Sequence, residues 1–348
     1  MRKIILSLVA VVLFGVGCVS VSSGPSGADG GVYKSINNGQ EWAQKSVVPM
    51  ASKATIFGAT NIRKLSYDPQ DSNAIYASTR ENGMFYSFDG AESWKRPAAL
   101  VEGFVADVVV DYSDKCNIYV AFGHRILKST DCNRTFQEVY RETADTIYIT
   151  ALAVDPFDNK HIYAGTINGA LIESLDSGKT WGKKQAFSKN QMVGIVFDKK
   201  NKSVIYIGFA SNGLWKTTDG GESFVDLSKG FKDKKGGSDI RGIVIDPEDS
   251  NRIFVHTKTK IMKSGNGGVD WEALPIISPA NVEISAFAIN PQSTKDMYYG
   301  TSTTFYRSQD GGATWSTKKL PTTRAATAIL VDFKNPSVIY LGSTKIDK

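Results

Sequence analysis

The sequence has 348 residues, of which 41% are hydrophobic and 22% charged, and its formal net charge is +6. This mildly basic balance does not by itself indicate a nucleic-acid partner, and we predict none. After the N-terminal segment, no apolar stretch is long enough to cross a bilayer as a helix.

The first 17 residues predict a secretory signal peptide. Arg2 and Lys3 form a positive start, and residues 4–16 are an almost unbroken apolar run that is short for a membrane span. Such segments are removed on export and take no part in the fold. Without Arg2 and Lys3, the net charge falls from +6 to +4.

Residues 15–18, Gly-Val-Gly-Cys, resemble a bacterial lipobox, although the usual leucine is replaced by Gly15. The resemblance implies that Cys18 is lipidated and anchors the protein, since more than one acyl chain gives stable attachment. The alternative is ordinary signal cleavage near the same place. Residues 18–30 are Ser/Gly-rich and predict a flexible tether. We therefore expect an exported protein anchored to a bacterial membrane, the outer one, facing the periplasm or the surface.

A short motif recurs seven times along the chain. The pattern is Ser/Thr-x-Asp/Asn-x-Gly-x-x-Trp/Phe, and its copies begin at Ser35, Ser87, Ser129, Ser174, Thr217, Ser264 and Ser308. Successive starts differ by 52, 42, 45, 43, 47 and 44 residues. A period near 44 is typical of the four-stranded blade of a β-propeller.

A second motif alternates with the first, also in seven copies. It is an apolar run, an acid or Asn, often Pro, then a short loop and a strand with an aromatic residue. The aromatic residues are Tyr76, Tyr119, Tyr163, Tyr206, Phe254, Tyr298 and Tyr340. Each unit therefore reads as strands A to D, with A and B in this motif and C and D around the first one.

The order of the motifs at the two ends predicts how the ring closes. The folded part begins with a C–D half and ends with an A–B half, which together make one blade. Closure by both termini removes the free edges of an open sheet. We predict an all-β fold in which residues 31–348 form a single seven-bladed β-propeller of four-stranded blades.

The seven motifs resemble the Asp-box, or BNR, repeats of bacterial sialidases, sortilin-type propellers, xyloglucanases and photosystem II assembly-factor-like proteins. The resemblance covers residues 31–343 and implies the fold, but these families differ in activity. Ala91 and Asn133 replace the motif glycine in two copies. Such drift suits a structural motif better than a catalytic one.

The acids of these boxes are predicted to be structural. In the copy at 174–181, Ser-Leu-Asp-Ser-Gly-Lys-Thr-Trp, the short acid can accept hydrogen bonds from turn N–H groups. A phosphate-binding loop would need glycine at Glu173 and a following helix, and neither is present. The equivalent positions are Asn37, Asp89, Asp131, Asp176, Asp219, Asn266 and Asp310.

The two remaining cysteines are predicted to pair. Cys116 lies in an A–B loop and Cys132 in the C–D turn of the same blade, so both belong to one rim. Export implies an oxidising compartment, where a disulfide forms readily. The alternative is two free thiols.

The opposite rim, made of B–C loops and D–A crossovers, is the predicted functional face. We call it the loop rim, and the rim with the A–B loops and boxes the box rim. Phe104 and Tyr148 supply aromatic surface on the loop rim. Its candidate binding residues are Arg63, Lys64, Arg80, His124, Arg125, Arg241, Lys258 and Lys260. A basic, partly aromatic face favours an anionic partner, either an acidic protein surface or a charged glycan; the alternative is ordinary solvated loops.

Catalytic machinery is weakly indicated. A sialidase-like arginine triad would require Arg63, Arg241 and Arg324, and the Arg-Ile-Pro motif of sialidases is absent. A glycosidase needs two carboxylates at a defined separation, for which Asp239 is available with Glu283 or Glu81.

The three histidines, His124, His161 and His256, lack metal-ligand spacing, so we predict neither metal nor cofactor. The sequence thus predicts a monomeric, lipid-anchored scaffold or assembly factor that binds a protein in the cell envelope. The alternative is a glycan-binding propeller or glycoside hydrolase, and enzyme activity stays open.

Overall fold

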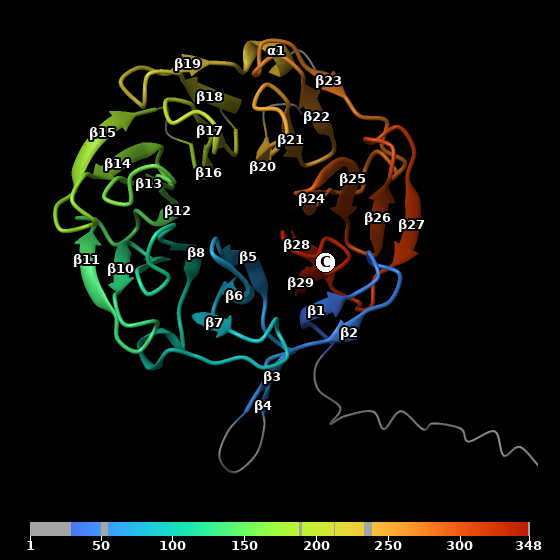
Figure 1. Cartoon of the computed structure of the whole chain (residues 1–348), viewed down its shortest axis with the longest axis horizontal. Coiled ribbons are helices and arrows are strands. Elements are labelled where there is room, and N and C mark those ends of the chain that lie inside the picture. Colours follow the sequence, from blue (N-terminus) through green and yellow to red (C-terminus); the bar gives the residue numbers. More distant parts are fainter. Residues whose placement is uncertain (1–28, 50–54, 188–189, 212, 233–238, 347–348) are drawn as a thin grey trace, which may run out of the picture.

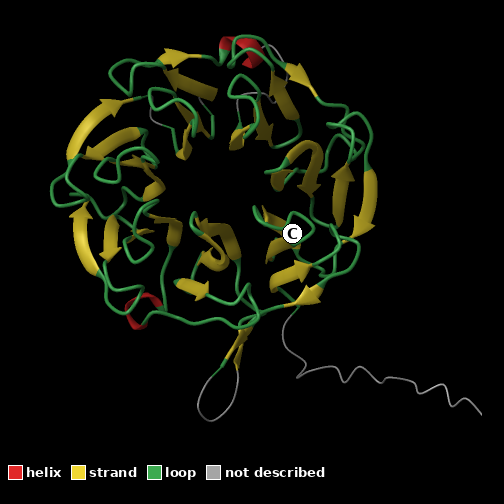
Figure 2. Cartoon of the chain, viewed as in Figure 1, coloured by secondary structure: helices red, strands yellow, loops and turns green. Residues whose placement is uncertain are grey.

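The computed structural model describes residues 29–49, 55–187, 190–211, 213–232 and 239–346. Its antiparallel sheets stand around a central opening as a seven-bladed β-propeller (Figure 1), which confirms the predicted fold. Within these ranges, helix is confined to α1 (Lys229–Lys232) and one 3-10 turn (Ala98–Leu100), as Figure 2 shows. Among the described residues, no helix is both long and apolar enough to cross a membrane. The predicted signal peptide and Cys18 lie outside the described residues.

We number the blades along the chain, each from its inner strand outwards. Blade 1 contains β5 (Ile62–Asp68), β6 (Asp71–Thr79) and β7 (Met84–Ser87). Blade 2 contains β8 (Val105–Val110), β9 (Ile118–Phe122), β10 (Arg125–Ser129) and β11 (Gln137–Arg141). Blade 3 contains β12 (Ile149–Val154), β13 (Ile162–Thr166), β14 (Ala170–Ser174) and β15 (Gly182–Ala186).

The next three blades repeat this order. Blade 4 contains β16 (Met192–Phe197), β17 (Ile205–Phe209), β18 (Gly213–Thr217) and β19 (Val225–Asp226). Blade 5 contains β20 (Ile240–Ile245), β21 (Ile253–Thr257), β22 (Ile261–Ser264) and β23 (Glu272–Ala273). Blade 6 contains β24 (Ala286–Asn290), β25 (Ser293–Gly300), β26 (Thr304–Ser308) and β27 (Ser316–Lys319).

Blade 7 is built from both ends of the chain, as the motif order predicted. It contains β28 (Ala325–Val331), β29 (Ile339–Thr344), β1 (Gly31–Ser35) and β2 (Ala43–Gln44). Strand β1 pairs antiparallel with β29 from Gly31↔Ser343 to Ser35↔Ile339. In blade 1 the fourth position is a single antiparallel pair, Tyr86↔Lys95. A small hairpin, β3 (Val47–Val48) and β4 (Thr55–Ile56), leads from blade 7 into blade 1.

Each box is a hydrogen-bonded turn, seen here in blade 3. Asp176 Oδ1 accepts hydrogen bonds from the hydroxyl of Ser174 and the backbone N–H of Thr180, both at 2.8 Å. Asp176 Oδ2 accepts from the Thr180 hydroxyl at 2.6 Å, and these bonds from Thr180 lower the pKa of Asp176 to about 2. Ser174 Oγ accepts from the N–H of Gly178. The acid therefore organises a turn rather than a reaction.

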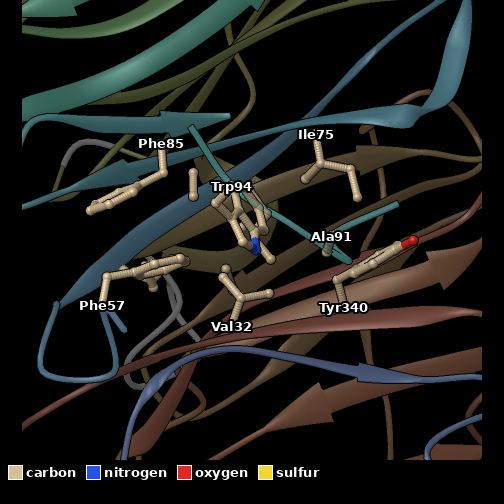
Figure 3. Packing of buried hydrophobic residues seen from close by; sticks show 11 residues of the cluster. Val32, Phe57, Ile75, Phe85, Ala91, Trp94 and Tyr340 are labelled. Atoms are coloured by element: carbon tan, nitrogen blue, oxygen red, sulfur yellow. The ribbon is translucent and has the colours of Figure 1, made fainter. Parts of the chain in front are cut away.

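The hydrophobic core consists of the seams between blades. Between blades 7 and 1, Trp94 is fully buried among Phe57, Phe85 and Val32, and its ring meets that of Phe57 edge-on at 5.6 Å. In Figure 3 these side chains and Tyr340 fill the space between the two sheets. Tyr340 donates its hydroxyl to the carbonyl of Gly90 in the box of blade 1, at 3.2 Å.

This tyrosine-to-box bond recurs around the ring. The strand-B tyrosine of a blade bonds the box turn of the next blade at six of the seven seams, at 3.0–3.4 Å. At three seams a lysine on the neighbouring strand also donates to the same carbonyl, namely Lys34, Lys128 and Lys216. Blade 5 is the exception, because its strand B carries Phe254.

The seam bond predicts opposite effects for two matched substitutions. Tyr206 donates to Gly267 at 3.2 Å, so Tyr206→Phe should lower the free energy of unfolding by about 1 kcal/mol. Phe254→Tyr should raise it by up to about 1 kcal/mol, because the missing donor is restored. Chemical denaturation of both variants measures this. A destabilised Phe254→Tyr would contradict the role given to the hydroxyl.

A second prediction concerns His256 in β21, which is only 7% exposed. Burial, reinforced by the charge of Arg241, lowers the pKa of His256 to about 3. The unfolded chain, with a histidine pKa of about 6.5, then binds one more proton than the folded protein between pH ~6.5 and ~3. Stability from this residue is complete above pH ~6.5 and is lost as the pH falls, by about 1.4 kcal/mol per unit.

His256→Leu should remove this loss. Its stability relative to the parent protein should improve by about 2 kcal/mol between pH 6.5 and pH 5. Denaturant unfolding at both values provides the measurement, and parallel pH profiles for the two proteins would exclude a buried neutral histidine.

Candidate functional site

The predicted binding residues fall into three groups on the loop rim. Blade 1 carries Arg63, Lys64 and Arg80; blade 2 carries His124 and Arg125; and blade 5 carries Arg241, Lys258 and Lys260. Figure 1 places β20–β22 across the central opening from β8–β10. The structure therefore brings the first two groups close together and leaves the third apart.

A pocket of about 350 Å³ opens on this rim between blades 2 and 3. Two predicted residues, His124 and Arg125, form part of its wall, together with both aromatic residues noted in the sequence. The full lining is Phe104, Phe122, Gly123, His124, Arg125, Asp145 and Tyr148. Its volume is at the small end of the range of about 300–1,000 Å³ for ligand pockets.

A short turn forms one side of the pocket. Strand β9 ends at Phe122 and β10 begins at Arg125, so only Gly123 and His124 form the connection. The equivalent turn of blade 3 has three residues, 167–169. Gly123 has φ +59°, a left-handed conformation suited to a two-residue hairpin.

The same turn is tied to both neighbouring segments. The N–H of Gly123 donates to the carbonyl of Phe104 at 3.0 Å, and its carbonyl accepts from the N–H of Ile149 at 2.9 Å. The backbone of this turn is thus held by Phe104, just before β8, and by β12, as well as by its own hairpin. This arrangement gives a preformed hollow rather than a loose loop.

Aromatic rings form the apolar part of the wall. Phe104 and Tyr148 lie 5.8 Å apart between ring centroids, and Tyr148 is 40% exposed. The guanidinium of Arg125 lies 4.8 Å from the ring centre of Phe122, a cation–π distance. Gly103 packs so close to Phe122 that a Cβ there would come within 2.8 Å of the ring.

The polar groups of the pocket are largely paired with one another. His124 Nε2 lies 3.2 Å from the carboxylate of Asp145 and 2.9 Å from a guanidinium nitrogen of Arg141. Glu138 pairs with Arg141 at 2.6 Å and with Arg125 at 3.6 Å. Asp145 is the one carboxylate in the lining.

Arg63 adjoins the pocket through Phe104. It occupies a β-bulge of β5, its Nε donates to the carbonyl of Ala106 at 3.1 Å, and its guanidinium lies 5.3 Å from the Phe104 ring centre. Burial lowers the pKa of Arg63, as does the charge of Arg80, while Asp107 opposes the change. Lys64 pairs with the buried carboxylate of Asp107 at 2.6 Å.

The blade 5 group is engaged locally. Arg241 pairs with Asp239 at 3.3 Å, and Lys258 pairs with Glu283. The N–H of Lys260 donates to the hydroxyl of Thr257. The two acids considered for glycoside hydrolysis in this region are therefore ion-pair partners of the predicted basic residues.

The structure joins Cys116 and Cys132 in a disulfide, with their Cα atoms 4.0 Å apart on the box rim. Within the described part of the chain, no three His, Cys, Asp or Glu side chains gather in a way that could hold a metal ion. The chemistry available on the loop rim is therefore aromatic contact, cationic hydrogen-bond donation and one histidine–carboxylate pair.

Sequence reasoning missed Phe122 and Asp145 as pocket residues. A signal for Phe122 was present: the segment Ala121-Phe-Gly-His-Arg125 has Phe where four other blades have Thr, and its turn is one residue shorter than those of blades 1, 3 and 4. Asp145 lies in a D–A crossover, which has no repeated pattern to place it.

No protein-family model matches the sequence. It is 32% identical to a xyloglucanase of Hypocrea jecorina over 170 residues, which are 36% of this chain and 20% of that protein. It is 27% identical to xyloglucanase Xgh74A of Acetivibrio thermocellus over 216 residues, 50% of this chain and 26% of that protein. The chain thus spans only a fifth to a quarter of these curated relatives.

Solved propellers of two kinds share the fold. The GH74 xyloglucanase of Xanthomonas campestris has a TM-score of 0.68 at 18% identity, covering 82% of this chain and 51% of that one. YCF48 from Cyanidioschyzon merolae has a TM-score of 0.62 at 13% identity, covering 86% and 98%. A structure of YCF48 bound to a D1 peptide has a TM-score of 0.61 at 14% identity, covering 82% and 94%.

Proposed function

We propose that this protein is a binding scaffold that captures a segment of another protein on its loop rim, centred on the pocket between blades 2 and 3. The observation that carries the proposal is the pocket itself: a preformed hollow of about 350 Å³ with three aromatic residues in its wall. Rigid aromatic surface supplies contact area at low entropic cost and is enriched in protein-binding sites.

The carboxylates support binding over hydrolysis. A glycosidase requires two carboxyl groups that flank the scissile bond. Only Asp145 lines the pocket, and it is paired with His124. Of the other candidate acids, Asp239 and Glu283 are ion-paired in the blade 5 region, and Glu81 accepts a hydrogen bond from Asn61.

The relatives support both a protein and a glycan partner. YCF48 has been solved with a bound peptide, which favours a protein partner for a propeller of this type. Xyloglucanases act on a glycan, and their similarity keeps a glycan-binding or glycan-cleaving propeller as the second candidate.

The proposed location rests on the N-terminal sequence. A signal peptide over residues 1–17, a lipidated Cys18 and a tether to residue 30 would hold the propeller at a bacterial outer membrane. There it would act as an assembly factor for an envelope complex. Metabolic labelling with a fatty acid, lost in Cys18→Ser, tests the anchor.

Two matched aromatic truncations test the binding face. Tyr148 is 40% exposed in the pocket, and Phe157 is 50% exposed on the box rim of blade 3. In pull-downs from detergent-solubilised membranes of the source cell, Tyr148→Ala should reduce recovery of the specific partner about tenfold, as expected for an aromatic hot spot. Phe157→Ala should leave recovery unchanged.

Equal recovery with both variants would exclude the pocket as the binding face. Incubation with xyloglucan separates the second candidate. The scaffold should release no new reducing ends, whereas hydrolysis that is lost in Asp145→Asn would favour the glycosidase.

A further inference from the structure

Two arginines beside the pocket have no acidic partner within the described part of the chain. Arg63 is held by the bond from its Nε to the carbonyl of Ala106, which leaves its terminal nitrogens for other acceptors. The N–H of Arg80 donates to the carbonyl of Asn61 at 3.2 Å, two residues before Arg63, and the charge of Arg80 acts on the Arg63 guanidinium. Repulsion between these like charges adds to the effect of burial on the pKa of Arg63.

The nearest carboxylate is already occupied. Asp107 Oδ1 accepts from Lys64 at 2.6 Å and from the N–H of Val108 at 2.9 Å. Asp107 Oδ2 accepts from the N–H of Leu152 at 3.2 Å. A half-buried guanidinium in this position retains its charge and is suited to bidentate recognition of a carboxylate.

Phe104 links this cationic spot to the pocket. Its ring lies 5.3 Å from the Arg63 guanidinium and 5.8 Å from the Tyr148 ring. An apolar group bound between Phe104, Phe122 and Tyr148 would therefore be separated from the Arg63 guanidinium by the Phe104 ring alone. Phe104 thus contacts the Arg63 guanidinium and also lines the apolar hollow.

We propose that this surface recognises a peptide in which an aromatic or large apolar side chain is adjacent to a carboxylate. The side chain would fill the pocket, and the carboxylate would accept hydrogen bonds from Arg63, with Arg80 adding to the attraction. The inference rests on the proposed function, since it names the chemistry of the protein segment that the loop rim would bind.

A peptide fits this site better than an acidic glycan. A sugar ring presents several hydroxyl groups that need hydrogen-bond partners on binding. The polar side chains of the pocket are engaged with each other, His124 with Asp145 and Arg125 with Glu138. Three aromatic rings with few unpaired polar groups suit an apolar side chain instead.

The test uses the whole exported domain and two blocked hexapeptides, acetyl-Gly-Ser-Phe-Asp-Ser-Gly-amide and the same peptide with Asn in place of Asp. Fluorine NMR of a 4-fluoro-labelled phenylalanine follows binding at low salt. The aspartyl peptide should bind about tenfold more tightly than the asparaginyl one, because a charge-assisted bond to arginine is lost in the latter.

The variants separate the two halves of the site. Arg63→Gln should abolish the preference for Asp over Asn, and Tyr148→Ala should weaken binding of both peptides. Arg80→Gln, at an exposed position, should reduce the preference about two- to threefold without affecting folding. Arg134→Gln, on the box rim of blade 2, is the control and should change nothing.

Equal binding of the two peptides, or binding of neither, would overturn the inference. So would Arg63-dependent binding of an oligogalacturonate in preference to the aspartyl peptide, which would assign the site to an acidic glycan. Failure here is distinguishable from failure of the proposed function. Membrane pull-downs that depend on Tyr148 but not on Arg63 would retain the scaffold and reject only the carboxylate.

Discussion

The structure depends on one interaction that no blade can make alone: the packing of its aromatic strand-B residue against the box of the next blade. Each sheet has two apolar faces, and both must be covered. At the seam between blades 4 and 5, Tyr206 and Lys216 both donate to the carbonyl of Gly267, and the lysine ammonium lies 5.2 Å from the tyrosine ring centre. The box organises a turn so that its carbonyl faces the preceding blade. The hydrogen bonds within the box therefore also help to hold neighbouring blades together.

Because the blades repeat, the residues at one seam can be compared with those at the others. The seam between blades 5 and 6 differs in two residues of strand B. In the other blades the residue two positions after the tyrosine is small: at Gly208, a Cβ would lie 2.8 Å from Ile243 of the next blade. Blade 5 has Phe254 for the tyrosine and His256 for the small residue, and His256 instead meets Phe287 at 6.1 Å. Both changes face blade 6, so this seam lacks the hydrogen bond from tyrosine to the next box and contains a buried titratable group.

The fold was predictable because it rests on local signals that recur. A box at each 42- to 52-residue interval and a Tyr-containing strand between boxes give the blade count and the closing blade without any long-range information. The pairing of the basic residues was not predictable in the same way. Lys64 meets Asp107 and Lys258 meets Glu283 across blade boundaries, and the sequence has no pattern that connects those positions. Five of the eight predicted cations on the loop rim have acidic partners. Fewer cations are therefore free to bind an anionic partner than the charge of the sequence indicates.

The boxes and A–B loops of the repeat occupy the box rim, so the loop rim is less constrained by the fold. A functional site is therefore best sought where a blade departs from the repeat on the loop rim. The box rim is filled with turn hydrogen bonds in every blade, so a departure there, such as Cys132 with its disulfide, is compensated locally. On the loop rim, blade 2 shortens its turn to Gly123 and His124 and replaces a turn-capping threonine by Phe122. In blade 1 the equivalent Thr79 accepts from and donates to its own loop, at 2.9 and 2.8 Å. The hollow lies where blade 2 combines a two-residue turn, as in blades 5 and 6, with a phenylalanine in place of the threonine, as in blade 4. Arg63, at the bulge in β5, meets the wall of the hollow at Phe104. The candidate site therefore lies where two variations of the repeat, each of which also occurs in another blade, come together in blade 2.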